Sequence, residues 1–245
     1  MPKISFKNDR QLGLLFSRAA DPARAEILSR FFKTGPGQYG EGDKFLGLTV
    51  PFTRSLVASY DDASDALVEE LLVHPYHEVR LLGVLLMVCR YERAKTDKEK
   101  AVALKFYLNH RFALNNWDLV DLSVYKVWGD YLLRHPQERS QLYRFAASSN
   151  LWERRMAVVA TMALIKAGEF KEILKLSQLL LKDKHDLMHK AVGWMLREVG
   201  KKDEGVLIKF LNQFAPRLPR TSLRYAIERL PEAWRQEYLK IKIIK

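Results

Sequence analysis

Asp121 is the residue of this chain whose surroundings most clearly require a chemical explanation. The helical spacing places five apolar residues on one face, and the side chain of Asp121 projects into this stripe of Trp117, Val120, Val124, Trp128 and Tyr131. Burying a lone carboxylate is energetically expensive, so Asp121 requires either a charged partner or a function. A carboxylate at such a position can stabilise positive charge that develops in a reaction.

Asp118 lies on another face of the same predicted helix, within its first turn. If Asn115 is the N-cap, Asp118 occupies the third helical position, where negative charge favours the helix dipole and a carboxylate can cap free N–H groups. We therefore interpret Asp118 as a structural residue and Asp121 as a candidate for chemistry.

Arg155 is the second polar residue on an otherwise apolar helix. It shares a face with Leu151 and Val158, whereas Arg154 points elsewhere. Because Arg155 follows Asp121 by 34 residues, close to one repeat of the chain, the two side chains are expected within reach of a charge pair. One interpretation is a purely structural salt bridge between repeats, since such networks also occur outside functional sites.

Trp194 completes the set, because helical spacing places it between the cations Lys190 and Arg197 on one surface. The functional interpretation is a cleft with a carboxylate, a guanidinium and the two indoles of Trp117 and Trp194. Such a cleft suits a nucleic-acid substrate whose reacting centre gains positive charge.

The charge of the chain indicates the class of partner. Its 245 residues include 41 Lys and Arg against 29 Asp and Glu, a net charge of +12, with 48% hydrophobic residues. An excess of this size favours a polyanion, usually nucleic acid, although a generically basic protein is the alternative. Cys89 is the single cysteine of the sequence, which excludes internal disulfides. Residues 1–7 lack the apolar core of a signal peptide, and no apolar run is long enough to span a membrane. We therefore expect a cytoplasmic protein.

Helical periodicity dominates the sequence and predicts an all-α fold in one domain, residues 1–245. The expected helices cover 8–20, 22–33, 51–59, 62–73, 76–93, 97–113, 116–134, 137–147, 151–167, 170–182, 186–200, 203–214, 219–230 and 231–242. Residues 33–50 are rich in glycine and lack the Lys-Ser/Thr ending of a phosphate-binding loop, so we expect a flexible connector there.

Cations recur near the start of successive apolar helices at Arg80, Arg155, Lys190 and Arg224. The last two intervals are 35 and 34 residues, and the first interval of 75 accommodates two repeats. This period is typical of an α-solenoid of HEAT-like helix pairs, which curves into a superhelix. One cation per repeat would give the concave face a basic stripe suited to a phosphate backbone.

Two histidine pairs give weaker signals. His185 and His189 have the spacing of metal ligands on a helix, but no third ligand is evident, so a solvated helix face is favoured over a zinc site. His74 and His77 flank Pro75 and are interpreted as turn residues. No metal and no organic cofactor is expected.

Three ordered blocks of this sequence resemble the DNA alkylation repair (AlkD-like) family of HEAT-like-repeat DNA glycosylases. The central block is Asn116–Asp121, followed by Gly129-Asp130 and His135-Pro136. The next two blocks, in the same order and at matching spacing, are Asn150–Arg155 and Lys190–Glu198. The resemblance extends from about residue 18 to 230.

The resemblance implies an all-helical glycosylase that acts, without extruding the damaged base, on duplex DNA with N3- or N7-alkylated purines. It implies that Asp121 is the catalytic carboxylate, that Arg155 is its neighbouring arginine, and that Trp117 and Trp194 flank the lesion. Arg80, Arg154, Lys190, Arg197 and Arg224 are expected DNA contacts of a chain that works as a monomer.

Two positions depart from the pattern of active members of that family. Asn116 stands where they have a tryptophan, and Phe31 stands where they have a tyrosine, so Phe31 keeps the ring of a lesion contact without its hydroxyl. Three functions therefore compete: an alkylpurine glycosylase, a non-catalytic binder of damaged, bent or branched DNA, and a protein-binding solenoid. The net charge of +12 favours the first two over the third.

Overall fold

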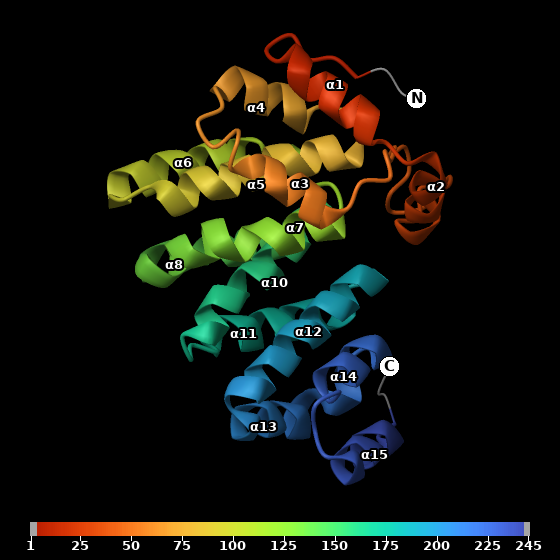
Figure 1. The fold of residues 1–245 in the computed structure, drawn as a ribbon. Coiled ribbons are helices and arrows are strands. Elements are labelled where there is room, and N and C mark those ends of the chain that lie inside the picture. The colour runs from red at the N-terminus through yellow and green to blue at the C-terminus, as the bar shows by residue number, and fades with distance from the viewer. Residues whose placement is uncertain (1–3, 243–245) are drawn as a thin grey trace. The chain divides into compact units, whose positions relative to one another are not determined.

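The computed structural model describes residues 4–242 of the chain, and these residues form helices joined by connections that are short except for the segment 32–49 (Figure 1). Between residues 4 and 242 the extended pairing is limited to an isolated bridge of Lys44 with Tyr76. The predicted all-α class is therefore confirmed. No helix in this range combines the length and the apolar character of a membrane-spanning segment. Part of the segment 1–7, where no signal peptide was expected, lies outside the described residues.

The chain divides into two compact units, Met1–Ser123 and Val124–Lys245. The first unit contains α1 (Arg10–Ala19), α2 (Pro22–Phe31), α3 (Val50–Val57), α4 (Asp65–Leu72), α5 (His77–Arg93), α6 (Asp97–Asn109), the 3-10 turn η1 (Arg111–Ala113) and α7 (Trp117–Val124), whose last residue begins the second unit. The centre of this unit is α5, which is buried without interruption from His77 to Val88 and packs against α3, α4 and α6. A helix that is apolar on all sides belongs inside a stack of helices.

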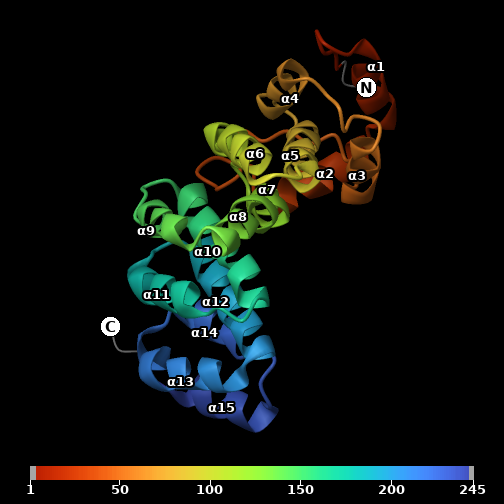
Figure 2. The ribbon, with the colours of Figure 1, turned by 90° about the vertical axis from the view of Figure 1, so that its left-hand side faces the viewer.

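The second unit is organised around α10 and α12. It contains the π turn η2 (Tyr125–Gly129), α8 (Asp130–Arg134), η3 (Pro136–Arg139), α9 (Ser140–Ala146), α10 (Leu151–Lys166), α11 (Lys171–Leu179), η4 (Leu180–Lys182), α12 (Asp186–Lys202), α13 (Glu204–Phe214), η5 (Ala215–Arg217), α14 (Arg220–Ala226) and α15 (Glu232–Lys240). Here α10 packs on α9 and α12, and α12 packs on α13 and α14. Both ribbon views show α10, α12 and α14 stacked in this order, in agreement with these contacts (Figure 2).

Helix starts follow from short polar side chains at the N-cap. Asp9, Asp21 and Ser64 each accept a hydrogen bond from the backbone N–H three residues later and so begin α1, α2 and α4. Thr96 and Glu99 form a reciprocal capping box at the start of α6. These caps explain why the predicted starts in this unit lie within a few residues of the observed ones.

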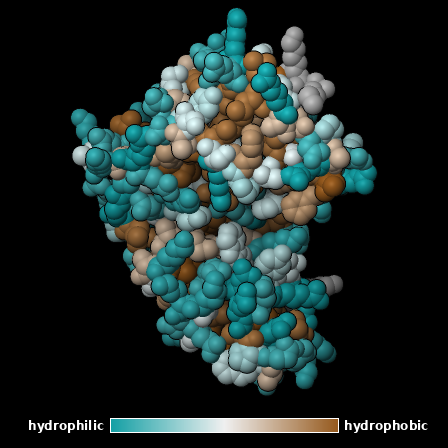
Figure 3. All heavy atoms as spheres, viewed as in Figure 1, coloured by the Kyte–Doolittle hydropathy of each residue, from teal (hydrophilic) through white to brown (hydrophobic). Residues whose placement is uncertain are grey.

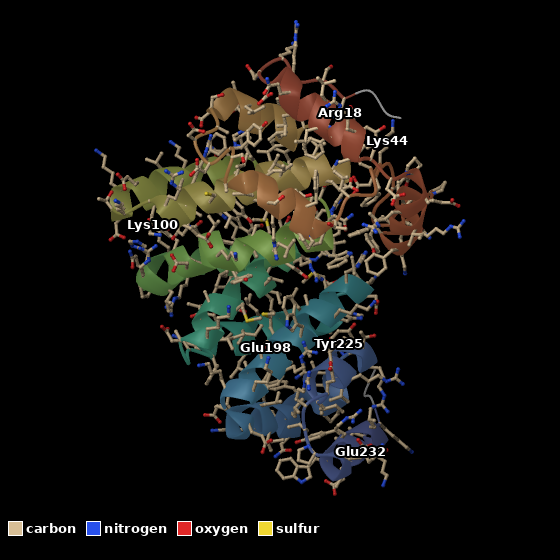
Figure 4. All side chains as sticks on the ribbon, viewed as in Figure 1. Arg18, Lys44, Lys100, Glu198, Tyr225 and Glu232 are labelled. Carbon is tan, nitrogen blue, oxygen red and sulfur yellow. The ribbon has the colours of Figure 1, made fainter. Side chains whose placement is uncertain are left out.

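The repeat inferred from cation spacing is visible in the helix starts of the second unit. The helices α10, α12 and α14 begin at Leu151, Asp186 and Arg220, intervals of 35 and 34 residues. The stacking of α12 on α14 requires a glycine: a Cβ at Gly193 would lie 2.5 Å from the carbonyl oxygen of Ser222 and 2.6 Å from the Cβ of Tyr225. Tyr225 lies where these two helices meet (Figure 4). The helical-repeat architecture is thus built by close contacts between successive inner helices.

The helix predicted over 116–134 is interrupted. It begins at Trp117 and changes at Tyr125–Gly129 into a π turn before α8 continues it. A π turn adds a residue to the helical repeat, so the stripe extrapolated at 100° per residue from Trp117 does not continue unchanged to Tyr131. Val120, Val124 and Trp128 are nevertheless fully buried, as the stripe predicted.

Polar residues cover most of the face drawn in Figure 3, with apolar residues in small separate patches. The apolar side chains are concentrated inside each unit, where Trp128, Tyr91, Tyr107 and Phe16 are among the largest that are fully buried. The hydrophobic core therefore follows the central helices of each unit, although some large apolar side chains such as Ile27 and Phe31 are exposed.

Candidate functional site

Asn116 starts the helix that includes Trp117 and Asp121. Its side-chain oxygen accepts the backbone N–H of Trp117 at 2.8 Å, and its backbone carbonyl accepts the N–H of Val120. The helix thus begins one residue later than the cap predicted at Asn115 allows. Asn116 is fully buried, so in this chain the position that departs from the family pattern is structural.

Asp118 is consequently the second residue of α7 instead of the third, and it does not act as a backbone cap. Its Oδ2 lies 2.8 Å from Nε2 of His77, and its Oδ1 is buried without a hydrogen-bond partner among the described residues. Only 7% of the residue is exposed. The structural role expected for Asp118 is therefore fulfilled through a histidine of α5.

His77 lies between two carboxylates. Its Nδ1 is 3.2 Å from Oδ2 of Asp43, and its Nε2 faces Asp118. Burial lowers the pKa of His77, but the charge and hydrogen bonds of Asp118 and Asp43 outweigh it and raise that pKa to about 9. Both ring nitrogens can donate only in the imidazolium form, so His77 is a buried cation at neutral pH. The interpretation of His77 as a turn residue was wrong: it is 2% exposed in the first turn of α5.

Asp43 gathers three donors from distant parts of the first unit. It accepts hydrogen bonds from His77, from the guanidinium of Arg80 and, at 3.0 Å, from Nδ2 of Asn116. Burial raises the pKa of Asp43, but the hydrogen bond of His77 and the charges of Arg80 and His77 hold it below its usual value. Asp43 is therefore an ionised acceptor buried within the unit.

The glycine-rich connector is tied to α5 at several points, which contradicts the flexible segment expected for residues 33–50. The carboxylate of Glu78 accepts the backbone N–H groups of Leu46, Gly47 and Leu48 at 2.8–3.1 Å. The carbonyl of Lys44, which Figure 4 labels, accepts the N–H of His77 at 2.8 Å. The same connection delivers Asp43 to the cluster.

An aromatic cluster surrounds Trp117. The ring of Phe32 stacks on the indole with centroids 5.3 Å apart and planes at 13°, and Phe31 meets it edge-on at 6.0 Å. Phe31 is 62% exposed, while Trp117 is partly exposed. The sequence predicted both residues for the substrate side, and the structure brings them together at one surface of the first unit.

Asp121 lies one helical turn after Trp117 and is partly exposed. Leu119 and Val120 beside it are fully buried, so the carboxylate occupies the boundary between the core and the surface. An acid at such a boundary can meet a ligand and is less screened by water than a fully exposed one. The sequence predicted a carboxylate buried within the apolar stripe, whereas Asp121 is only partly buried.

The cations of the predicted basic stripe differ in availability. Arg80 is 5% exposed, and its guanidinium donates to Asp43 and to the carbonyl oxygen of His74. This guanidinium is therefore not open to a phosphate, unlike the cation that the basic stripe predicted. Arg155 is 4% exposed and donates to the carbonyl oxygen of Leu187 at 2.6 Å. In these two repeats the guanidinium joins neighbouring segments of its own unit.

The remaining predicted contacts lie nearer the surface of the second unit. Arg154 pairs with Asp183 at 2.7 Å, Lys190 pairs with Asp186 at 2.8 Å, and Arg197 pairs with Glu228. Trp194 is partly exposed and Arg224 is exposed. Their contact with DNA stays a prediction.

The histidines with metal-ligand spacing have other contacts. His185 accepts the backbone N–H of Leu187 and begins α12, and Nε2 of His189 lies 2.6 Å from the carbonyl oxygen of Asp183. Both are partly buried instead of lying on a solvated face. Their ring nitrogens are engaged in the local structure of the helix start.

Sequence reasoning missed His77 and Asp43. The available signal for His77 was its place at the start of a long apolar run together with Glu78 and Arg80. Asp43 gave no signal, because its contacts join residues 34, 37 and 73 positions apart in the chain.

Comparison with known proteins agrees with this fold. The family described as DNA alkylation repair enzyme matches residues 14–230. A solved structure described as a predicted DNA alkylation repair enzyme from Enterococcus faecalis superposes with a TM-score of 0.67 at 17% identity, covering 87% of this chain and 97% of the other. None of the curated proteins compared matches the chain.

Proposed function

The chain belongs to the family of DNA alkylation repair enzymes, and on this premise we propose that it is a monofunctional DNA glycosylase. Its substrate would be duplex DNA with N3- or N7-alkylated purines, whose N-glycosidic bond it hydrolyses without extruding the base. The observation that supports this most directly is Asp121, a partly exposed carboxylate one turn beyond Trp117 on a helix whose start is held by buried charges.

The proposed reaction needs little acid catalysis. Alkylation at N3 or N7 makes the purine cationic, so it leaves with the bonding electrons as a neutral base. The deoxyribose then gains oxocarbenium character, which the carboxylate of Asp121 stabilises while it orients a water molecule. Water adds to the sugar carbon and loses a proton, which leaves an abasic site and the free alkylated base. No metal and no organic cofactor takes part in this scheme.

Aromatic and cationic side chains have the supporting roles in this proposal. Trp117 and Phe31 would offer ring surface to the sugar and backbone beside the lesion, and Trp194 would do so from the second unit. The proposed phosphate contacts are the predicted cations that lie nearer the surface, Arg154, Lys190, Arg197 and Arg224. Arg80 and Arg155 are omitted, since the guanidinium of Arg80 is buried against Asp43 and that of Arg155 against the carbonyl oxygen of Leu187.

The test is release of methylated base from an alkylated duplex under single-turnover conditions. Asp121→Asn keeps the shape of the side chain and removes its charge, so excision should slow by roughly 10²–10³-fold without loss of the fold. Asp62→Asn, a change of the same kind at an exposed position of the same unit, should leave the rate unaltered. A rate for Asp121→Asn within a few-fold of the wild type would remove Asp121 from the mechanism.

A non-catalytic role in binding damaged, bent or branched DNA is the second candidate. The exposed ring of Phe31, which lacks a hydroxyl at a predicted lesion contact, favours it. Under this alternative the wild-type chain binds distorted duplexes in a salt-sensitive manner and releases no base. The same base-release experiment therefore separates the two functions.

A further inference from the structure

We infer that His77 is a positioning residue for the proposed reaction: through Asp43 and Asp118 it sets the place of α7 and thereby orients Trp117 and Asp121. The inference rests on the proposed glycosylase function. Its basis is that three segments distant in the sequence meet at one imidazole: the connector at Asp43, the first turn of α5, and the first turn of α7 at Asp118.

The contacts bracket Trp117 on both sides. Asp43 binds the side chain of Asn116, the residue before Trp117, and His77 binds Asp118, the residue after it. Asn116 in turn accepts the N–H of Trp117. One side-chain contact therefore lies on each side of Trp117, at Asn116 and at Asp118. Together they fix the start of the helix and its rotation about its own axis.

Rotation matters because a helix transmits it rigidly. Asp118 and Asp121 are three residues apart, so their side chains leave α7 about 60° from each other around the axis. Fixing the direction of Asp118 therefore fixes the direction of Asp121. A shift of about 1 Å in a reacting group can cost on the order of 10²-fold in rate.

Within the cluster the charges are balanced only when His77 is protonated. Two carboxylates, Asp43 and Asp118, then face one imidazolium and the guanidinium of Arg80. The ring also contacts the uncharged side chains of Phe32 and Phe45. Asp118 depends on His77 in particular, since its second oxygen has no hydrogen-bond partner among the described residues.

A merely structural histidine would lower stability without acting through Asp121. A double-mutant cycle on the single-turnover rate of base release distinguishes the two. We expect His77→Gln to slow excision about tenfold or more in the wild-type background and to have little further effect beside Asp121→Asn. Equal slowing in both backgrounds would overturn the inference.

Backbone hydrogen exchange gives a readout that does not depend on catalysis. His77→Gln should speed exchange in the first turns of α7 at least tenfold while α10 and α12 are unchanged. Unchanged exchange in α7 would also overturn the inference. If the wild type releases no base, the glycosylase proposal fails by itself, and exchange alone then decides whether His77 holds α7.

Two further variants keep the test interpretable. Asp118→Asn removes the charge with little change of shape, and it should reproduce the kinetic and exchange effects if His77→Gln fails to fold. His110→Gln alters another histidine of the same unit, 3.2 Å from Glu69 and outside the cluster, and it should change neither readout.

Discussion

At the scale of single residues, the balance around His77 makes a prediction about pH. The pKa of this histidine is raised from 6.5 to about 9 in the folded chain, so folding gains stability from its protonated form. That gain is complete below about pH 6.5 and is lost as the pH rises through about 9. A shift of this size corresponds to on the order of 3 kcal/mol.

Chemical denaturation at pH 6 and at pH 9.5 measures this effect. Other groups titrate over the same range, so the quantity to compare is the difference in free energy of unfolding between the wild type and His77→Gln. This difference should shrink at the higher pH, because deprotonation weakens the wild-type contact that the variant lacks. A difference that is constant with pH would show that the charge of His77 does not contribute.

The sequence singled out some residues of the candidate site and missed others for a physical reason. Trp117 and Asp121 were found because they are one helical turn apart, a spacing visible in the sequence. His77 and Asp118 are 41 residues apart, and Asn116 and Asp43 are 73 apart. Contacts at such separations depend on how helices stack, which no local pattern specifies.

At the scale of helices, the contact of α12 with α14 depends on Gly193. Gly193→Ala would place a methyl group 2.5 Å from the backbone carbonyl oxygen of Ser222, and a backbone atom cannot move aside as a flexible side chain can. Ser222 also donates to the carbonyl oxygen of His189 at 2.9 Å, which holds the two helices at this separation. We expect the substitution to destabilise the chain by about 1–3 kcal/mol, measured by urea denaturation.

Gly205→Ala is the matched control for that prediction. Gly205 lies in the first turn of α13, and a Cβ there would be 3.3 Å from a side-chain oxygen of Asp203, the N-cap of this helix, so that a shift of a few tenths of an ångström relieves the contact. Alanine is a better helix former than glycine by about 1 kcal/mol, so Gly205→Ala should be neutral or stabilising. Equal losses for both variants would contradict the close approach at Gly193.

The elements themselves were largely predictable, with two exceptions. Apolar periodicity and the capping residues gave the helices and most of their starts, because these signals are local. The π turn at Tyr125–Gly129 was not predicted, because the residue types of this segment do not indicate the wider hydrogen-bond spacing of a π turn. The ordered structure of the segment before Val50 was also not predicted. Its backbone N–H groups donate to the carboxylate of Glu78, which comes from α5 and is distant in the sequence.

At the scale of the whole molecule, the repeat predicted from the cation spacing is present, but not every cation in its register lies on the surface. The 34- and 35-residue repeat is confirmed by the starts of α10, α12 and α14. Of the four cations in that register, Arg80 and Arg155 are buried, whereas Arg224 is exposed. A regular cation position can therefore be either a tie between segments or a surface charge, and burial distinguishes them.

This difference gives a prediction for DNA binding. The logarithm of the binding constant for duplex DNA should fall linearly with the logarithm of the salt concentration, because phosphate contacts release counterions. Arg224→Ala should reduce that slope by about 1 and weaken binding to all sequences alike, as expected for loss of one phosphate contact. Arg229→Ala, a change at an exposed arginine close in sequence but outside the register, is the control and should alter the slope less. Titration of a labelled duplex between 50 and 200 mM salt, roughly the range over which such contacts are resolved, measures both slopes. A slope near zero for the wild type would argue against phosphate recognition by this protein, and equal slopes for Arg224→Ala and the wild type would remove Arg224 from it.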